Sequence, residues 1–409
     1  MTTRASFEYN VVMPLASLFI VRMLGLFMVL PVLALYGNNY TDTTPLLLGL
    51  ALGVYGFSQA LLQVPFGALS DRFGRKPLIA IGLGIFALGS VIAANAESIY
   101  GLIIGRSLQG AGAISGVVIA MVADLTKEEN RTKAMAIIGL SIGITFSLAL
   151  ILGPLLTALG GIELIFWVTA SLTMIGFVIL FWLIPTPSNP KYSKVGSTAI
   201  IGDLIKIFND RELQHINLSI FVLHFVLMAL FLILPLIIEE SLSISRQHHS
   251  WLYLSVLVAS FILMLPIMIW AEKFRQVKLA IVGSIILLVS TTLILSQQAL
   301  VNQLIVIGAI CLFFVGFNYL EATLPSLMSK TAPTDKKGTA SSIFSMCQFA
   351  GAGTGGFIGG WLLTHWGTKG VFIGATGLLS LWLIVSLTMK VSAKATSKQQ
   401  SASSCAVNK

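Results

Sequence analysis

Long apolar runs alternate with short polar breaks along nearly the whole chain. A helix needs roughly 20 apolar residues to cross the hydrocarbon layer of a bilayer, and the runs predict twelve such helices. Strands of a transmembrane barrel would instead show segments of about ten residues with alternating polarity. The predicted spans are 11–36, 46–69, 77–95, 99–123, 134–159, 162–184, 213–238, 251–271, 278–297, 301–328, 338–364 and 370–389.

The composition also indicates a membrane protein. Of the 409 residues, 56% are hydrophobic and 10% are charged, with a mean hydropathy of +0.92, whereas about a quarter of an ordinary soluble domain is charged. The first run is too long for a signal peptide, contains Arg22 and lacks a small-residue cleavage site after it, so we interpret it as the first helix. Cys311, Cys347 and Cys405 show no paired spacing, so neither a disulfide framework nor a metal site is expected.

The basic residues are distributed unevenly between the loops. If the amino terminus is inside, the outside segments hold only Arg246 and Lys369, and the inside loops hold the other loop bases. Lys and Arg near helix ends are retained on the cytoplasmic side. We therefore expect a multi-pass protein of the inner membrane with both termini in the cytoplasm. Topology then accounts for the net charge of +9, and no nucleic-acid partner is expected.

A polar segment divides the chain into two halves. It contains Pro185, Pro187 and Pro190, which cannot continue a helix. The predicted organisation is an N-terminal six-helix half (1–184), a cytoplasmic linker (185–212), a C-terminal six-helix half (213–390) and a polar cytoplasmic tail (391–409). Residues 200–208 fit either a short helix on the membrane surface or a disordered connection. The tail lacks the apolar content needed to fold.

Two short sequence matches relate the halves. PFGALSDRF from Pro65 shares a proline, an acid, a base and a phenylalanine with PIMIWAEKF from Pro266. RTKAMAIIG from Arg131 resembles KGTASSIFS from Lys337. Together with the central linker, they indicate a duplicated six-helix unit, which is one way in which secondary transporters are built.

The break after the second helix carries the most specific motif. GALSDRFGRKPL from Gly67 resembles the signature of the major facilitator superfamily, with Ser70 where the family usually has Ala. The glycines permit a tight turn and the bases favour the anionic inner leaflet, while Asp71 is placed to face a helix amino terminus or an Arg. A loop that only sets topology is the alternative interpretation. The defining positions are Gly67, Leu69, Asp71, Arg72, Gly74, Arg75 and Lys76.

Two further motifs of that family are present, one of them incompletely. LIIGRSLQGAGA from Leu102 resembles the second motif and places Arg106 inside an apolar span. A central Arg costs about 2.5–3.5 kcal/mol on insertion scales, so it must face a cavity or a partner. A structural hydrogen-bonding role is the alternative. The exporter-type third motif keeps Gly139, Gly143, Gly153 and Pro154, but residues 155–158 lack its final glycines, so this motif alone does not assign an antiporter.

Other passages are similar to the drug:proton antiporter branch of the superfamily. These are RMLGLFMVLP from Arg22, ADLTKEENRTKAMA from Ala123, FVLHFVLM from Phe221 and FNYLEATLPSL from Phe317, within a similarity over residues 10–390. The resemblance implies an all-helical major facilitator fold and proton-coupled efflux of small amphipathic compounds or drugs. A carrier of this branch has an extra carboxy-terminal cytoplasmic domain, which this chain is expected to lack. Proton symport or facilitated import of a small metabolite is the alternative, because the fold supports both.

Few ionisable residues lie deep in the predicted spans, where an uncompensated charge is expensive. They are Arg22, Arg106, His224 and Glu321. An imidazole titrates near pH 6.5, and a carboxyl taken out of water can also hold a proton near neutral pH. We predict Glu321 as the proton-coupling residue and His224 as its partner. A neutral core histidine that is hydrogen-bonded to a neighbour is the alternative for His224.

The remaining candidates concern substrate and gating. We expect no cofactor apart from the proton as coupling ion, no enzymatic constellation such as HExxH, and a monomer that binds a small-molecule substrate. Arg75 is expected to pair with Asp124 when the protein is open outward, and the adjacent His248 and His249 are expected to be solvated. The predicted cavity residues are Arg22, Arg106, Met23, Phe27, Asn318, Tyr319 and Gln348. The predicted gating residues are Gly67, Asp71, Arg72, Gly74, Arg75, Lys76, Asp124 and Glu272.

Overall fold

The computed structural model describes residues 8–186, 206–297, 302–333 and 336–389. The regular elements within these ranges are helical, apart from an isolated bridge between Thr41 and Ser98. The predicted tail lies outside the described residues, and so does most of the linker segment 200–208. Ten stretches of the described chain are long and apolar enough to cross a membrane.

The helices follow the predicted apolar runs. The first part of the chain forms α1 (Tyr9–Phe27), α2 (Leu33–Tyr36), η1 (Gly37–Asn39), α3 (Pro45–Phe73), α4 (Arg75–Ala94), α5 (Ile99–Ala111), α6 (Ser115–Leu125), α7 (Glu128–Val178) and η2 (Ile179–Leu183). The second part forms α9 (Arg211–Phe231), α10 (Leu234–Glu240), η3 (Arg246–His248), α11 (His249–Lys273), α12 (Val277–Ser296), α13 (Gln303–Thr331) and α14 (Lys337–Thr388).

The two longest elements each comprise two helices. α7 contains 51 residues and is non-helical at Gly160 and Gly161, while α14 contains 52 residues and is non-helical at Gly367. Gly161 and Gly367 have φ angles of 73° and 64°, a region that glycine enters without steric cost. These glycines lie in the gaps expected between the spans 134–159 and 162–184, and between 338–364 and 370–389.

Non-helical residues interrupt three of the predicted spans, and the span prediction did not indicate these breaks. The chain leaves the helix after Phe27, after Ala111 and after Phe231. Hydropathy does not reveal these breaks because the chain stays apolar across them. Two of the breaks carry the same sequence pattern, LFMVLP ending at Pro31 and LFLILP ending at Pro235. A proline cannot supply the backbone donor that a continuous helix needs. The repeated pattern therefore indicates these two helix breaks, which hydropathy does not show.

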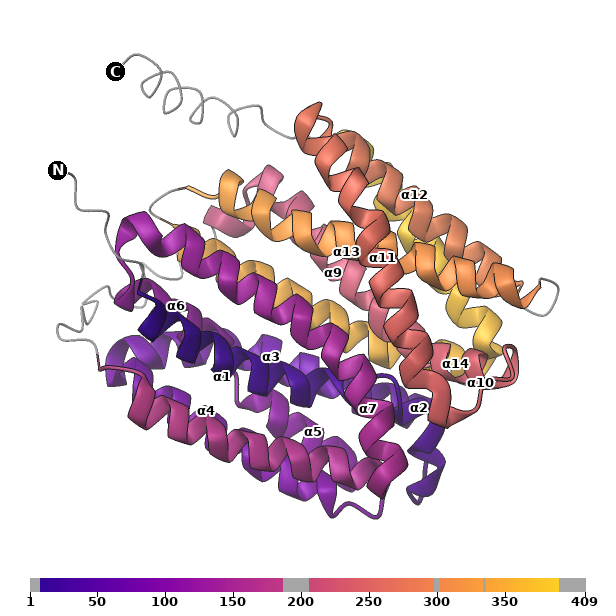
Figure 1. Ribbon diagram of the computed structural model, residues 1–409, viewed down its shortest axis with the longest axis horizontal. Helices are drawn as coiled ribbons and strands as arrows, with labels where there is room; N and C mark the ends of the chain where they lie inside the picture. The colour runs from indigo at the N-terminus through magenta and orange to yellow at the C-terminus, as the bar shows by residue number, and fades with distance from the viewer. Residues whose placement is uncertain (1–7, 187–205, 298–301, 334–335, 390–409) are drawn as a thin grey trace.

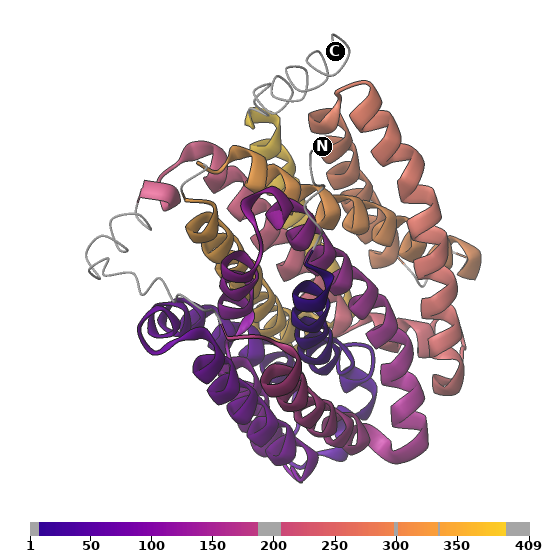
Figure 2. The same cartoon turned by 60° about the vertical axis from the view of Figure 1, so that its left-hand side comes forward.

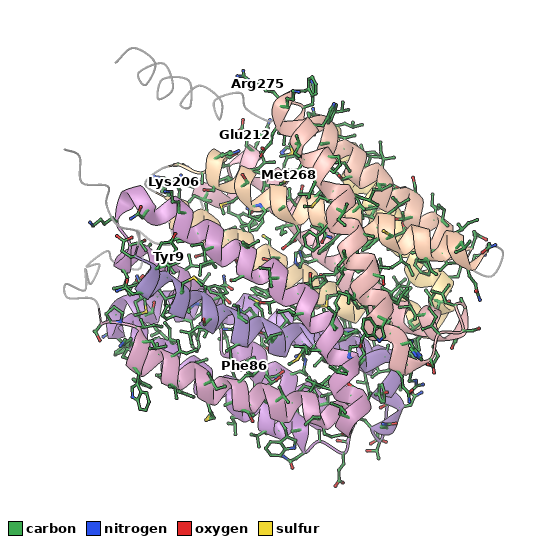
Figure 3. All side chains as sticks on the ribbon, in the orientation of Figure 1. Tyr9, Phe86, Lys206, Glu212, Met268 and Arg275 are labelled. Carbon is green, nitrogen blue, oxygen red and sulfur yellow. The ribbon has the colours of Figure 1, made fainter. Side chains whose placement is uncertain are left out.

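The bundle has two ends with different character. α1 begins and α14 ends on the same side of Figure 1, and we call this the terminal end. Figure 3 shows Tyr9, Lys206, Glu212 and Arg275 along this side. We call the opposite end, which carries α2 and α10 in Figure 1, the distal end. The elements up to η2 group on one side, and those from α9 on group on the other (Figures 1 and 2).

The two groups meet in a seam formed by glycines of α3 and α14. A Cβ atom added at Gly356 would lie 2.6 Å from the carbonyl oxygen of Gly49 and 2.7 Å from the backbone nitrogen of Gly53. A Cβ atom added at Gly56 would lie 2.7 Å from the backbone nitrogen of Gly353. Because real side chains never pack so close to backbone atoms, the seam requires glycine on both helices. All of these contacts lie in the distal half of α3.

Polar contacts also join the two groups at the distal end. The Arg246 Nη1 atom donates to the carbonyl oxygen of Leu35 over 3.2 Å, and its guanidinium lies 5.1 Å from the centre of the Tyr36 ring. Its Nε atom pairs with Glu239 at 2.9 Å. The Ser250 hydroxyl donates to the carbonyl oxygen of Ile151. The distal end is therefore closed in this structure.

We predict that Gly356→Ala weakens this closure. The added methyl group must push α14 away from the backbone of α3, so the distal end should open in a larger share of molecules. Labelling of a distal cysteine with a membrane-impermeant thiol reagent should become several-fold faster. Gly308→Ala is the matched control, because a Cβ atom there meets nothing within 4 Å. Equal labelling of the two variants would contradict the role given to the seam.

Candidate functional site

Three of the predicted residues meet in the second half of the chain. His224 lies on α9, Glu321 on α13 and Gln348 on α14. The Gln348 Nε2 atom lies 2.8 Å from His224 Nε2 and 3.4 Å from Glu321 Oε1. His224 Nε2 also lies 3.8 Å from Glu321 Oε2. The expected neighbours His224 and Glu321 thus lie together, and Gln348, which was predicted only as a cavity residue, bridges them.

The hydrogen bonds of His224 define its arrangement. Its Nδ1 atom lies 3.2 Å from the carbonyl oxygen of Ile220, one turn earlier on α9. A carbonyl oxygen can only accept, so Nδ1 carries the proton there, and Nε2 of a neutral imidazole is an acceptor. The Gln348 amide is then the donor to Nε2. This geometry matches a neutral histidine that is held on both sides.

Glu321 is less completely satisfied. Its Oε2 atom is buried and has no hydrogen-bond partner, although 27% of the side chain is exposed. A buried carboxylate oxygen without a donor is expensive in a region of low dielectric constant. A proton, or a donor group on a bound molecule, would relieve this cost. The site is therefore suited to gain and lose a proton.

Aromatic rings connect this site with the first half of the chain. The Phe317 ring lies 6.1 Å from the His224 ring and 6.0 Å from the Phe146 ring of α7. Phe146 also packs edge-on against Phe27 and Phe231, which end α1 and α9 at the helix breaks. The predicted cavity residue Phe27 is thus part of an aromatic cluster between the two groups of helices.

The other predicted residues of this region are packed rather than exposed. Asn318 is buried and donates to the Ser260 hydroxyl over 3.0 Å. Met23 and Tyr319 are buried as well, and the Tyr319 hydroxyl interacts with Thr323. Their contribution to substrate binding stays a prediction.

Arg22 is completely buried inside the first half. Its Nε atom donates to the Tyr55 hydroxyl over 3.1 Å, and its Nη1 atom donates to the carbonyl oxygen of Gly112 over 2.5 Å. Its Nη2 atom donates to the side-chain oxygen of Gln59. Gly112 lies in the break between α5 and α6, where helix carbonyls lose their regular donors. Arg22 therefore stabilises this break.

Arg106 has a similar role at the break after α1. Its Nη1 atom donates to Gln109 Oε1 over 2.9 Å and to the carbonyl oxygen of Gly25, in the last turn of α1, over 3.4 Å. Its guanidinium lies 5.0 Å from the centre of the Tyr55 ring. Neither Arg106 nor Arg22 forms an ion pair within the described chain. Carbonyl dipoles and the ring face supply the compensating negative charge.

The motif after α3 forms a compact polar turn. Gly74 has a φ of 96°, which explains the need for glycine there. Arg75 pairs through Nη1 with Asp71 at 2.6 Å and through Nε with Asp124 at 3.0 Å. It also donates to the Ser70 hydroxyl. Asp71 thus faces an Arg, as the sequence indicated.

The predicted pair of Arg75 with Asp124 is confirmed. It was expected when the protein is open outward, and it forms here while the distal end is closed. Both residues belong to the first half, so the pair can persist whatever the distance between the halves. The remaining gating candidates Arg72, Lys76 and Glu272 lie at the same terminal end, and Gly67 accepts a hydrogen bond from Ser70.

His249 also differs from the expectation of a solvated side chain. Only 1% of it is exposed, and its Nε2 atom lies 3.1 Å from the carbonyl oxygen of Ile244. The loop before α11 folds back over it and buries it. His248 remains on the surface and contacts the Ser245 hydroxyl.

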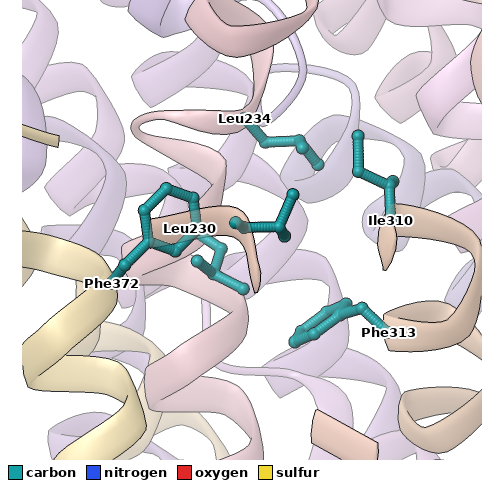
Figure 4. A pocket seen from close by; sticks show the side chains of 6 residues that line it. Leu230, Leu234, Ile310, Phe313 and Phe372 are labelled. Carbon is teal, nitrogen blue, oxygen red and sulfur yellow. The ribbon is translucent and has the colours of Figure 1, made fainter. Parts of the chain in front are cut away.

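Two hollows lie away from the predicted residues. A cavity of about 10 Å³ lies beside the break between α9 and α10, with Leu230, Leu234, Ile310, Phe313 and Phe372 around it (Figure 4). It has room for about one water molecule but offers no polar partner to hold it. A groove of about 610 Å³ at the terminal end runs beside the start of α1 and the end of η2. The described residues contain no group of three His, Cys, Asp or Glu side chains that could hold a metal ion.

Comparisons with known proteins agree with this architecture. The Major Facilitator Superfamily profile matches residues 15–214 and 216–404. The inner membrane transport protein YajR of Escherichia coli (strain K12) is 43% identical over 377 residues, which cover 92% of this chain and 82% of that protein. Multidrug resistance protein MdtH of Yersinia enterocolitica is 25% identical over 343 residues, 83% of each chain. The crystal structure of a D-xylose-proton symporter matches with a TM-score of 0.72 and 15% identity, over 94% of this chain and 98% of that one.

We predict that Arg22→Lys and Arg106→Lys lower stability. A lysine cannot reproduce the planar fork of donors, so acceptors such as the Gly112 and Gly25 carbonyl oxygens would lose their partners. Each unsatisfied buried group costs roughly 1–3 kcal/mol. Thermal unfolding of the detergent-solubilised protein should begin several degrees lower. Arg275→Lys, at an exposed position, should have no effect. Unchanged melting of both buried variants would show that neither site needs the guanidinium.

The Arg75–Asp124 contact predicts the outcome of a charge swap. Arg75→Asp combined with Asp124→Arg should recover part of the transport that either single variant loses. Recovery should be incomplete, because an aspartate at position 75 would face Asp71. Since the pair is partly exposed, the coupling energy in a double-mutant cycle should not exceed about 1 kcal/mol. A double variant no better than the worse single one would contradict the pairing.

Proposed function

This chain belongs to the major facilitator superfamily, and from that premise we propose that it exports small amphipathic organic compounds in exchange for protons. It is a multi-pass transport protein of the inner membrane. Its mechanism would be alternating access between two six-helix halves. We further propose that it acts as a monomer and needs no cofactor other than the coupling proton.

The proposed topology has twelve spans and cytoplasmic termini. The ten long stretches become twelve spans when α7 and α14 are each counted as two helices. The terminal end carries the basic loops, such as Arg72 to Lys76, whereas the distal end carries Arg246 and Lys369. The excess of bases supports a cytoplasmic terminal end. With its distal end closed, the structure would then represent a carrier facing the cytoplasm.

The arrangement of His224, Gln348 and Glu321 carries this proposal. An ionisable pair inside a membrane helix bundle is costly, and such residues mark substrate or proton pathways. The pair lies beside the aromatic cluster through which the halves touch, so a change in its charge would act at the moving interface. Glu321 would take up the proton, and His224 would act as its partner.

One proton provides enough free energy for this exchange. A difference of one pH unit contributes about 1.4 kcal/mol, and a membrane potential of 100 mV contributes about 2.3 kcal/mol. Together they support a concentration gradient of several hundredfold. A stoichiometry of one proton per substrate is therefore adequate.

The direction of transport is proposed from the similarity to known transporters. The similarity to MdtH, which is named for multidrug resistance, favours export. The D-xylose-proton symporter has the same fold, so the fold itself does not distinguish export from import. Proton symport or facilitated import of a small metabolite is the competing function. Substrate-induced proton flux in proteoliposomes with an imposed pH gradient, measured for a panel of amphipathic compounds, separates the two by its sign.

We predict that Glu321→Gln uncouples transport from the proton. The amide mimics the protonated carboxyl, so substrate binding and downhill exchange should persist, while the acceleration by an imposed pH gradient should disappear. His224→Ala should shift the pH optimum with a smaller loss of maximal rate. Both effects are measured by dye or radiolabel uptake into proteoliposomes at several internal pH values.

Glu240→Gln, at an exposed distal position, is the matched control and should keep the dependence of the wild type. If Glu321→Gln still accumulates substrate against its gradient with unchanged proton dependence, the coupling site lies elsewhere.

A further inference from the structure

We propose that Gln348 is a positioning residue that competes with the coupling proton for His224 and transmits proton binding to the seam between α3 and α14. This inference rests on the proposed function, because it presupposes that the His224–Glu321 pair binds the proton. It adds a third residue whose hydrogen bond reports the protonation of the pair. It also adds a physical link from that pair to the closed distal end.

The competition follows from the number of lone pairs. A neutral imidazole with its proton on Nδ1 offers a single acceptor lone pair, at Nε2. Gln348 Nε2 occupies this acceptor at 2.8 Å, while Glu321 Oε2 lies 3.8 Å from it without any partner. A proton bound to Glu321 Oε2 would turn that oxygen into a donor, and a movement of about 1 Å would bring it within hydrogen-bond distance of His224 Nε2, which now lies 3.8 Å away. The proton and the Gln348 amide therefore need the same lone pair.

Transfer of the proton to His224 leads to the same result. Nε2 would then carry a hydrogen and become a donor, facing the donor NH₂ group of Gln348. Two donors cannot form a hydrogen bond, so the amide must move or rotate. If the proton stays on the carboxyl, the Gln348–His224 bond is lost. If it passes to the imidazole, the amide must rotate so that its oxygen accepts from Nε2. In both cases the present bond, in which Gln348 is the donor, is broken. The structure, with this bond formed and the distal end closed, thus corresponds to the proton-free state.

The helix that carries Gln348 also forms the seam. The next residue, Phe349, places its carbonyl oxygen 2.5 Å from a Cβ atom built at Gly56, and Gly353 and Gly356 follow on the same helix. The glycines that face α3 begin about one turn after Gln348. This stretch of α14 is also packed against the backbone of α9 through Gly351 and Gly355. We propose that the loss of the Gln348 bond changes how α14 sits against α9, and with it the contacts of the seam.

Other charged groups do not compete for this role. Among the ion pairs of the described residues, Glu321 faces His224, at 3.8 Å. Arg22 and Arg106 are engaged with groups of the first half, and Glu272 lies on α11 at the terminal end. Cys347 stands beside Gln348 in the sequence and is partly buried. The Gln348 amide contacts both His224 and Glu321, so its hydrogen bonds depend on the charge state of this pair.

The experiment measures protonation and distal opening separately, without a substrate. Protonation of Glu321 is followed in lipid nanodiscs by the infrared band of its carboxyl group, which is identified by its loss in Glu321→Gln. Distal opening is followed by the distance between spin labels at Glu97 and Lys369, two exposed distal positions of the two halves, in a background without native cysteines. Both are recorded as a function of pH.

In the wild type, acidification should protonate Glu321 and decrease the distal-closed population with the same midpoint. In Gln348→Leu the competing donor is absent, so the proton affinity should rise about five- to tenfold, which moves the carboxyl midpoint up by roughly 0.7 to 1 pH unit. The distal distance should no longer follow this midpoint. Gln348→Asn keeps an amide on a shorter side chain, so its carboxyl midpoint and its distal distance change should lie between those of the wild type and of Gln348→Leu. This variant replaces Gln348→Leu in the test if the leucine variant does not fold.

Gln214→Leu, at an exposed position of α9, is the matched control and should behave as the wild type. If Gln348→Leu and Gln348→Asn both keep the wild-type midpoint and the wild-type distance change, Gln348 has no part in coupling, while the proposed proton site stands. If the wild type shows no pH-dependent carboxyl band that depends on Glu321, the proposed proton site fails, and this inference fails with it.

Discussion

The fold depends on one constraint: inside the hydrocarbon layer the protein must satisfy its own backbone groups and charges, because no water is available. Breaks in three apolar helices make this constraint severe, since each break leaves helix carbonyls without donors. Arg22 and Arg106 donate to the carbonyl oxygens of Gly112 and Gly25 at two of these places. The same bonds give the two guanidinium groups their compensating partial charges. The carbonyl groups at the helix breaks and the buried guanidinium groups thus stabilise each other. Their hydrogen bonds also connect the helices of the first half.

In the second half, the helix break and the buried polar groups are satisfied in a different way. When LFMVLP is aligned with LFLILP, the position of Arg22 corresponds to Val226, so no guanidinium lies at the equivalent place. The break after Phe231 is filled by apolar side chains, and the polar groups of this half, His224, Gln348 and Glu321, form bonds that depend on protonation. The first half thus contains two arginines bonded to backbone carbonyl oxygens, whereas the second half contains the pair that we propose to bind the proton.

The sequence was sufficient for the features that depend on composition and motif. Hydropathy placed the long helices, the motif with Gly74 and Arg75 predicted a glycine turn with an Asp71 partner, and the cost of buried charge directed attention to His224 and Glu321. It was insufficient where the outcome depends on backbone geometry or on contacts between distant helices. The helix breaks leave hydropathy unchanged. The sequence does not show that Gly56 of α3 lies against Gly353 of α14, because this contact depends on how the two helices pack. It also does not show that Gln348 bridges His224 and Glu321, for the same reason.

The seam explains why small free energies can control the distal closure. Glycine-lined helices approach closely but contribute mainly dispersion contacts, which are individually weak, and the directional bonds across the halves at the distal end, from Arg246 and Ser250, are neutral-acceptor hydrogen bonds. A shift of a two-state equilibrium from 1:99 to 99:1 requires about 5.5 kcal/mol, whereas one proton under a typical gradient provides a few kcal/mol. The contact of Arg246 with the Tyr36 ring and the packing of Phe146 against Phe231 also hold the two halves together. The proposed protonation of one site should therefore change the population of the closed state without inverting it completely.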